Sequence, residues 1–517
     1  MIISTESSLL NSQLNRKQQV WFVFIGLIGS FWLWFATFRH GIGISPDSVG
    51  YMAVAENLLK GKGFISYNGE LFIVQPPMYP VAIAAFSFFS GLSPVKSTLL
   101  LNLLLLPLTT YVSGKLAFLI TKSFSVSLLV CFSIVFGVPI NHVFTYAWSE
   151  PLFIFLLTFA LLYMVKFIDS DKKKYLVICS ISVGFLTITR YVGIFIIIAF
   201  LMLLLLAIEK KVIKRRNEIC LFLFISSSPI CFWAVRNYNL SGSFFGRSNR
   251  SLYGIGEHAF GFSEAITSWF ILPVNYFQNK ILIFLIAIAL LSSILSITAL
   301  NHGKNLKTLA LIILVYVYSL FLFITCVNTQ TDLIGNRLLS PIFIPLAIVL
   351  LDLFYHRIYI RVVNKIPKKM HFLPTALSYV IWFTYPIVFT LALGLESYRE
   401  GLGYHATHWQ QSETIAYARQ AHKHLVQLPI YTNQPEAVYF FAQIQAGRLR
   451  CVQSNLIAYT SDPTWLEAEQ VYLICFKEDY LSDCLGTLKS AYHPDINLIA
   501  EFSDGAIYLM TRRKKSI

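Results

Sequence analysis

Charged residues are scarce in this chain, and acidic residues are scarcer than basic ones. Only 13% of the 517 residues are charged, which is about half the fraction that a soluble globular domain carries. The hydrophobic fraction is 56% and the mean hydropathy is +0.63. These values exclude an ordinary soluble protein, and we expect most of the chain to lie in lipid.

Signals for nucleotides and nucleic acids are also missing. The sequence has no P-loop, and no Gly-x-Gly-x-x-Gly motif stands between a strand and a helix. The net charge is +15, but the basic residues stand in short clusters between apolar runs, as residues that set membrane topology do. We therefore expect no nucleic-acid partner.

Eight cysteines are present, without a Cys-x-x-Cys or Cys/His pattern for a structural metal. Five lie in or beside apolar runs and are interpreted as small core residues, namely Cys131, Cys179, Cys220, Cys231 and Cys326. The polar C-terminal part holds Cys451, Cys475 and Cys484, and this odd number excludes a fully paired disulfide framework. Cys475 and Cys484 could pair in an oxidising compartment.

Long apolar runs dominate the rest of the chain. The polar residues 1–19 precede the first run without the features of a cleavable signal, so we expect a cytoplasmic tail. A membrane span takes about 20 apolar residues. Eleven runs qualify, near 20–38, 97–120, 126–141, 149–168, 175–189, 191–208, 219–236, 281–300, 306–326, 338–355 and 373–395. The pattern predicts an all-α membrane bundle over residues 20–395.

Run 77–92 is an ambiguous twelfth candidate. The positive-inside rule places the basic loops 209–218 and 356–371, and also Lys172–Lys174, in the cytoplasm. If the N-terminus is cytoplasmic too, an even number of spans must precede Lys172–Lys174. Counting run 77–92 makes five spans and omitting it makes four. We therefore predict that this run forms an in-plane or re-entrant helix on the outer face.

The same topology places several regions outside the cytoplasm, namely 39–96, 142–149, 237–280, 328–337 and the C-terminal part 396–517. The C-terminal part is polar and alternates β-like runs with helices. Strands are predicted at Leu428–Asn433 and Val471–Phe476, and a helix at Pro435–Gln443. Asp504–Gly505 is a hairpin signal. We expect a small α/β domain outside the cytoplasm.

The first outer loop is the most informative segment. Residues 45–64 read SPDSVGYMAVAENLLKGKGF, in which Tyr51 and later apolar residues recur at helical spacing before two glycines. The pattern predicts an amphipathic helix along the membrane surface that starts at Pro46. Asp47 at its N-terminal end is either a helix cap, a role that Ser45 can also fill, or a catalytic carboxylate.

A proline-broken segment follows this helix. Gln75–Pro80 reads QPPMYP, and its prolines interrupt the chain where it re-enters the apolar layer. A polar helix followed by a broken apolar helix forms a roofed groove at the membrane surface. Such a groove suits a catalytic site that needs both lipid and water.

Charged residues at span ends supply further candidates. Glu150 opens a span on the predicted face of Asp47, where two carboxylates could share a divalent metal ion or divide the work of base and orienting group. A structural role at a helix N-terminus is the alternative for Glu150. Guanidinium groups on that face suit a phosphate-bearing ligand, with snorkelling as the alternative. They belong to Arg190, Arg236 and Arg337.

The order of these segments resembles that in GT-C glycosyltransferases of the protein O-mannosyltransferase and aminoarabinose transferase type. The matching segments are PDSVGYMAVAENLLKGKGF, QPPMYP, Ser149–Glu150, the RNYNLSGSFF that begins at Arg236, and Arg337–Pro341. They come in the family's order and extend over residues 40–345. The stretch YTNQPEAVYFFA in the C-terminal part resembles the outer domain of bacterial members.

The resemblance implies roles for individual residues. Asp47 would be the general base toward the acceptor, Glu150 the second acid, and Arg337 the group on the donor phosphate. Arg190 and Arg236, from their places at span ends, are further candidates for binding the donor, and Tyr51 is another. Many members have Asp as the second acid and an acidic pair in the first loop, whereas this chain has Glu150 and, after Asp47, Ser48. A metal site on Asp47 and Glu150 therefore stays open, and Asp47 alone carries the base.

The implied activity is transfer of a hexosyl or pentosyl unit from a polyprenyl-phosphate carrier at the outer face of the inner membrane. The acceptor would be a lipid, a glycan or a protein. A lipid or sugar transporter or flippase would share the many spans and the intramembrane charges. It would need neither an outer loop with a carboxylate nor an outer C-terminal domain, and the sequence shows no inverted repeat. A non-catalytic assembly or sensor protein is the third possibility.

Overall fold

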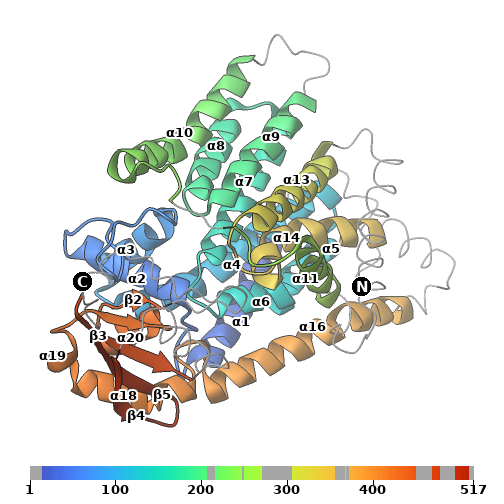
Figure 1. Cartoon of the computed structure of the whole chain (residues 1–517). Coiled ribbons are helices and arrows are strands. Elements are labelled where there is room, and N and C mark those ends of the chain that lie inside the picture. Colours follow the sequence, from blue (N-terminus) through green and yellow to red (C-terminus); the bar gives the residue numbers. More distant parts are fainter. Residues whose placement is uncertain are drawn as a thin grey trace.

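The computed structural model describes residues 14–206, 216–246, 250–269, 306–355, 367, 372–449, 468–477 and 495–511. Apolar helices form most of this structure, and a small sheet domain from the C-terminal part lies beside helices of the first outer loop (Figure 1). The predicted fold class, a helical membrane bundle followed by a small α/β domain, is confirmed.

Six helices in the described part are long and apolar enough to cross a membrane. They are α1 (Arg16–Thr37), α4 (Pro94–Thr121), α7 (Glu150–Ser170), α10 (Arg216–Ser241), α13 (Leu306–Asn328) and α14 (Asn336–Leu353). Each of them coincides with one of the predicted spans. Asn15 caps α1 through its side chain, but the apolar run decides where each helix lies.

The other predicted spans correspond less simply to the helices of the structure. Runs 175–189, 191–208 and 373–395 lie in α8 (Lys173–Thr187), in η2 (Tyr191–Gly193) with α9 (Ile194–Leu206), and in α16 (Phe372–Glu400). Run 281–300 lies outside the described residues. The predicted outer loop 237–280 contains α11 (Ile255–Ser268).

Run 126–141 is not one straight span. It forms α5 (Phe124–Phe136) and α6 (Val138–Phe144), which meet at 48°. Gly137 between them is extended, with φ −67° and ψ 126°, and Pro139 has no N–H group with which to continue the ladder of α5. A Cβ atom on Gly137 would lie 2.5 Å from the Ser133 carbonyl oxygen. Hydropathy could not reveal this bend, because it depends on backbone contacts.

The first outer loop forms α2 (Pro46–Leu59) and α3 (Met78–Ser90). The 13 residues of α3 extend about 20 Å, whereas the hydrocarbon core is about 30 Å thick. This length fits the predicted in-plane or re-entrant helix. The prediction that α2 is amphipathic is wrong, because residues 48–55 are all buried. The helices that pack on α2 are α3, α4 and α20 (Pro435–Ala442).

The C-terminal part folds around a mixed sheet of order β2-β1-β3-β5-β4. Its strands are β1 (Ile430–Thr432), β2 (Gly447–Arg448), β3 (Gln470–Phe476), β4 (Asp495–Glu501) and β5 (Gly505–Thr511). Its other helices are α17 (Thr407–Gln410), α18 (Glu413–Gln420) and α19 (His422–Leu425). The hairpin predicted at Asp504–Gly505 is confirmed by antiparallel pairing of β4 with β5. Cys475 is buried in β3, and Cys484 lies outside the described residues.

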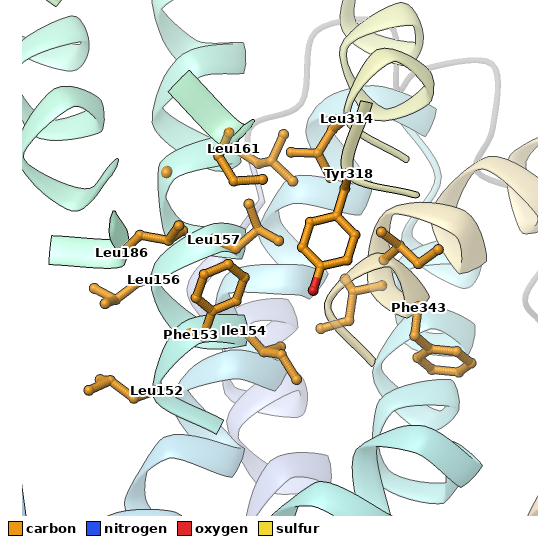
Figure 2. Packing of buried hydrophobic residues seen from close by; sticks show 14 of the residues in the cluster. Leu152, Phe153, Ile154, Leu156, Leu157, Leu161, Leu186, Leu314, Tyr318 and Phe343 are labelled. Carbon is orange, nitrogen blue, oxygen red and sulfur yellow. The ribbon is translucent and has the colours of Figure 1, made fainter. Parts of the chain in front are cut away.

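Helix α7 lies at the centre of the membrane bundle and contacts α4, α8, α13 and α14. Phe153 and Leu157 of α7 point toward Tyr318 of α13 (Figure 2). The Tyr318 hydroxyl donates to Leu338 O at 2.8 Å, which joins α13 to α14. In lipid, close packing and such hydrogen bonds hold helices together. This packing fixes Glu150 at the start of α7.

Candidate active site

Two backbone hydrogen bonds bring the start of α2 next to the start of α7. Gly43 N donates to Thr145 O at 2.8 Å, and Ala147 N donates to Gly43 O at 2.9 Å. Asp47 lies in the first turn of α2, and Glu150 is the first residue of α7. The pairing therefore places two carboxylates, far apart in sequence, at the same end of the bundle.

Arg337 joins these two carboxylates. Its Nη2 lies 2.5 Å from Asp47 Oδ2 and its Nε lies 2.7 Å from Glu150 Oε1. Its Nη1 lies 3.2 Å from Asp332 Oδ2. The guanidinium carbon also stands 4.3 Å from the centroid of the Trp148 ring. The planar guanidinium group suits this position because its three nitrogen atoms donate in different directions. A lysine could not make the same contacts.

Glu150 is the buried centre of the cluster. Its side chain is 0% exposed, and its Oε1 also forms an ion pair with Arg190 Nη1. Arg190 Nη1 donates in addition to Ser149 Oγ at 3.1 Å. A buried carboxylate is tolerated only when it is paired and hydrogen-bonded. Glu150 therefore orients both arginines and does not itself meet the solvent.

Asp47 differs from Glu150 in its access to solvent. Its side chain is 35% exposed, and Gln75 Nε2 donates to its Oδ1 at 3.0 Å. The cap of α2 is Ser45, whose hydroxyl accepts from Ser48 N at 3.4 Å. The alternative interpretation of Asp47 as the cap of this helix is therefore wrong. Asp47 is held in place by long-range partners and remains open to an incoming molecule.

Tyr51 and Arg236 were the other candidate donor residues. Tyr51 is buried one turn after Asp47, and its ring packs edge-on against Tyr79 at 5.1 Å. Burial, together with the Asp47 carboxylate, raises the pKa of Tyr51. Arg236 contacts other residues, since its Nη1 donates to Phe72 O at 2.9 Å. The structure therefore brings Tyr51 to the carboxylates and places Arg236 on the far part of the first loop.

Three residues of the cluster carried no role in the sequence analysis. Gln75 appears only within its proline-rich motif, and Trp148 only within the predicted outer segment 142–149. Asp332 lies five residues before Arg337, in a predicted outer segment. The only signal in the sequence that could have indicated these residues is their position. Each is a polar or aromatic residue in a predicted outer segment that holds or adjoins a candidate charged residue.

All the predicted outer regions meet in the structure. The contacts of Asp47 with Arg337 and of Gly43 with Thr145 join three of them. Region 237–280 is joined through Trp269 Nε1, which donates to Asn336 Oδ1 at 2.8 Å. The C-terminal part is joined through Tyr404 N, which donates to Ile44 O at 2.7 Å. The described parts of these regions therefore share one side of the molecule.

The cluster does not fit a divalent metal ion shared by Asp47 and Glu150. Arg337 stands between the two carboxylates, where a shared cation would have to sit. Among the residues that the structure describes, no three His, Cys, Asp or Glu side chains converge in a metal-binding group. Glu150 Oε2 is buried without a hydrogen-bond partner, but the arginines already pair with Glu150 Oε1 and Asp47 Oδ2. We therefore assign no step to a metal.

No protein-family model matches the sequence, and no curated protein matches it. Solved structures do match. ArnT from Cupriavidus metallidurans bound to undecaprenyl phosphate has a TM-score of 0.56 and 13% identity, covering 95% of this chain and 97% of that one. AglB from Archaeoglobus fulgidus with an inhibitory peptide and a dolichol-phosphate has a TM-score of 0.55 and 9% identity, covering 97% and 75%.

A third match is an Archaeoglobus fulgidus oligosaccharyltransferase in complex with zinc and sulfate. Its TM-score is 0.55 and its identity 12%, covering 94% of this chain and 72% of that one. At identities this low, the matches show only that the folds are alike. The likeness extends over almost the whole of this chain in all three comparisons. The predicted resemblance is confirmed at that level: this chain has the fold of the GT-C glycosyltransferases.

Proposed function

We propose that the protein is a membrane glycosyltransferase that moves a sugar from a polyprenyl-phosphate carrier to an acceptor on the extracytoplasmic side. The observation that carries the proposal is the partly exposed Asp47 carboxylate, held by Arg337 at the end of the bundle where the predicted outer regions meet. The GT-C fold supports it, since the matching structures include ArnT with undecaprenyl phosphate and AglB with a dolichol-phosphate.

The chemistry follows from the charges. An acceptor O–H or N–H group attacks the anomeric carbon, the new bond forms there, and the bond from that carbon to the phosphate oxygen breaks. The electron pair of the broken bond stays on the phosphate, and Asp47 takes the acceptor proton. The developing negative charge on the phosphate is stabilised by guanidinium groups fixed in advance. The lipid tail of the donor remains in the membrane throughout.

The arginines keep donors available for this work. A guanidinium group has five N–H donors, and Arg337 uses its three nitrogen atoms once each on Asp47, Glu150 and Asp332. Hydrogens on its two terminal nitrogens therefore remain for a phosphate. Arg190 is held through Nη1 alone by Glu150 and Ser149. We propose that Arg337 and Arg190 bind the donor phosphate, with Glu150 as their positioning residue.

The direct test is the reaction of the purified protein in detergent or liposomes with a radiolabelled polyprenyl-phosphate sugar. Transfer to an added acceptor extract, or release of the sugar to water, is the expected result. A protein that binds the donor and neither transfers nor hydrolyses it would contradict the proposal. Movement of the intact donor between leaflets without bond cleavage would identify a flippase instead.

Arg337→Ala is expected to weaken donor binding. The change removes a charged hydrogen-bond donor worth about 1.5–3 kcal/mol, so affinity for undecaprenyl phosphate should fall by one to two powers of ten. Arg236→Ala is the matched control, because that guanidinium donates to Phe72 O. Titration of both variants with the lipid phosphate measures the effect. Unchanged affinity in Arg337→Ala would refute its role at the phosphate.

Chelation of divalent cations is expected to leave transfer unchanged. Arg337 already supplies the positive charge between Asp47 and Glu150 that a shared metal ion would supply. The measurement compares initial rates after dialysis against EDTA with rates after readdition of Mg²⁺, Mn²⁺ or Zn²⁺. Metal content by mass spectrometry gives an independent readout. Loss of activity on chelation, with recovery on readdition, would show that the cluster opens to admit a cation.

A further inference from the structure

Residues 42–44 run between two other segments of the backbone. On one side, Gly43 is paired with Tyr146 in the segment that leads to α7. On the other side, Ile44 N donates to Leu402 O at 3.3 Å, and Tyr404 N donates to Ile44 O at 2.7 Å. We call this arrangement of residues 42–44, 145–147 and 402–405 the clasp. It joins the segment before Asp47 to the first residues of the C-terminal part.

Glycine is required where the clasp closes. Gly403 has a φ of +58°, and a Cβ atom there would lie 2.0 Å from Ile44 O. On the other side, a Cβ atom on Gly43 would lie 2.7 Å from a ring carbon of Tyr146. No side chain can yield at Gly403, because the obstructing atom belongs to the backbone. The chain from the C-terminal part therefore fits against residue 44 only with glycine at position 403.

A histidine adds a side-chain contact to the clasp. His405 Nδ1 lies 2.7 Å from Ile42 O, and a carbonyl oxygen requires that this nitrogen be the donor. Burial lowers the pKa of His405, so the ring is neutral near pH 7 and carries its proton on Nδ1. The other ring nitrogen, Nε2, is not needed for this contact. An asparagine side chain could place an N–H group at the same distance from Cβ.

A second contact secures the same loop beyond α2. Tyr67 OH donates to Glu436 Oε1 at 2.9 Å, and Glu436 is also paired with Arg448. Glu436 is 6% exposed, and burial with the Glu436 charge raises the pKa of Tyr67. Between these two contacts, α20 packs on α2. The C-terminal part therefore holds the loop that carries Asp47 on both sides of α2.

We propose that the clasp positions the Asp47 carboxylate, so that the C-terminal part acts in the reaction through Gly403 and His405. This inference rests on the proposed glycosyl transfer. Helix α2 begins at Pro46, immediately beyond the clasp, so a displacement of residues 42–44 moves Asp47 with them. Arg337 comes from α14, and its guanidinium group lies over Trp148, the residue that follows segment 145–147 of the clasp. Gly403 and His405 are thus positioning residues for the base.

The test is Gly403→Ala, with Gly61→Ala as its matched control. Gly61 has a φ of +71° in the first outer loop, and nothing lies within 4 Å of an added Cβ atom. Both variants carry the strain of a positive φ, but only Gly403→Ala must move the backbone of residue 44. We expect kcat of Gly403→Ala to fall by about 10²-fold, the loss that follows a displacement of about an ångström. The donor KM and the kcat of Gly61→Ala should stay near wild type.

A double variant separates positioning from general damage. If Gly403 acts through Asp47, adding Gly403→Ala to Asp47→Asn should lower the single-turnover rate no further, because the base is already absent. Rates that multiply would overturn the proposal. If Gly403→Ala does not fold, His405→Ala should lower kcat and His405→Asn should restore it. Equal kcat in His405→Ala and wild type, or no rescue by His405→Asn, would also overturn it.

The control on the wild-type protein keeps the two proposals apart. A wild-type protein that transfers no sugar would refute the proposed function itself. An active wild-type protein with an unimpaired, folded Gly403→Ala variant would leave the transferase intact and remove the clasp from its mechanism.

Discussion

Asp47→Asn is expected to lower the rate of sugar transfer by about 10²–10⁴-fold. Asparagine has nearly the same shape and can still accept the hydrogen bond from Gln75, but it cannot take the acceptor's proton. The ion pair with Arg337 is lost, and with a side chain 35% exposed this costs about 1 kcal/mol or less. The variant should therefore fold normally, and Arg337 keeps its contact with Glu150 to bind the donor phosphate.

The control for this substitution is Asp332→Asn. Asp332 contacts the same guanidinium group at 3.2 Å, but its side chain is 71% exposed, so its loss should change the rate little. Asp47→Glu should be impaired, because the longer side chain displaces the carboxylate by about an ångström. Single-turnover transfer from a labelled polyprenyl-phosphate sugar measures all three. Near-normal turnover in Asp47→Asn would remove Asp47 as the base.

The parts of this structure that follow from local patterns were predictable. Helix α2 begins where Ser45 and Pro46 predict, because capping and the fixed φ of proline act within a few residues. The β4–β5 hairpin follows from Asp504–Gly505 in the same way. The candidate charges Asp47, Glu150 and Arg337 were found because charge is expensive in an apolar chain and therefore stands out.

The partners of these charges were not predictable. Arg337 and Asp47 are 290 residues apart in sequence, and no local rule says that one guanidinium group contacts both acids. Arg236 looked equivalent to Arg337 by charge and position, but tertiary packing directs it to Phe72 O. The burial of α2 was missed because α20, which covers it, comes from the far end of the chain. Sequence periodicity records local exposure and not such coverage.

Glu150→Gln is expected to destabilise the protein more than any other change in the cluster. The carboxylate is 0% exposed and pairs with Arg190 and Arg337. Removing one partner of a buried ion pair costs about 3–5 kcal/mol, because it leaves an uncompensated charge. The glutamine oxygen can still accept a hydrogen bond, but Arg190 would lose its only carboxylate charge among the described contacts and keep the neutral Ser149 Oγ. Thermal unfolding in detergent should show a large fall in melting temperature, and transfer should fall too, because both arginines lose the group that orients them.

Glu56→Gln is the matched control, since it removes a carboxylate from the exposed pair of Glu56 with Lys60 at the end of α2. Its melting temperature should match that of the wild type. The double variant Glu150→Gln with Arg190→Gln should be more stable than Glu150→Gln alone, because it removes the guanidinium group that the single change leaves without a carboxylate. If the second change instead adds its own destabilisation, the cost does not come from an unpaired charge. A melting temperature near wild type in Glu150→Gln would mean that water reaches Arg190 and that Glu150 does not hold the cluster together.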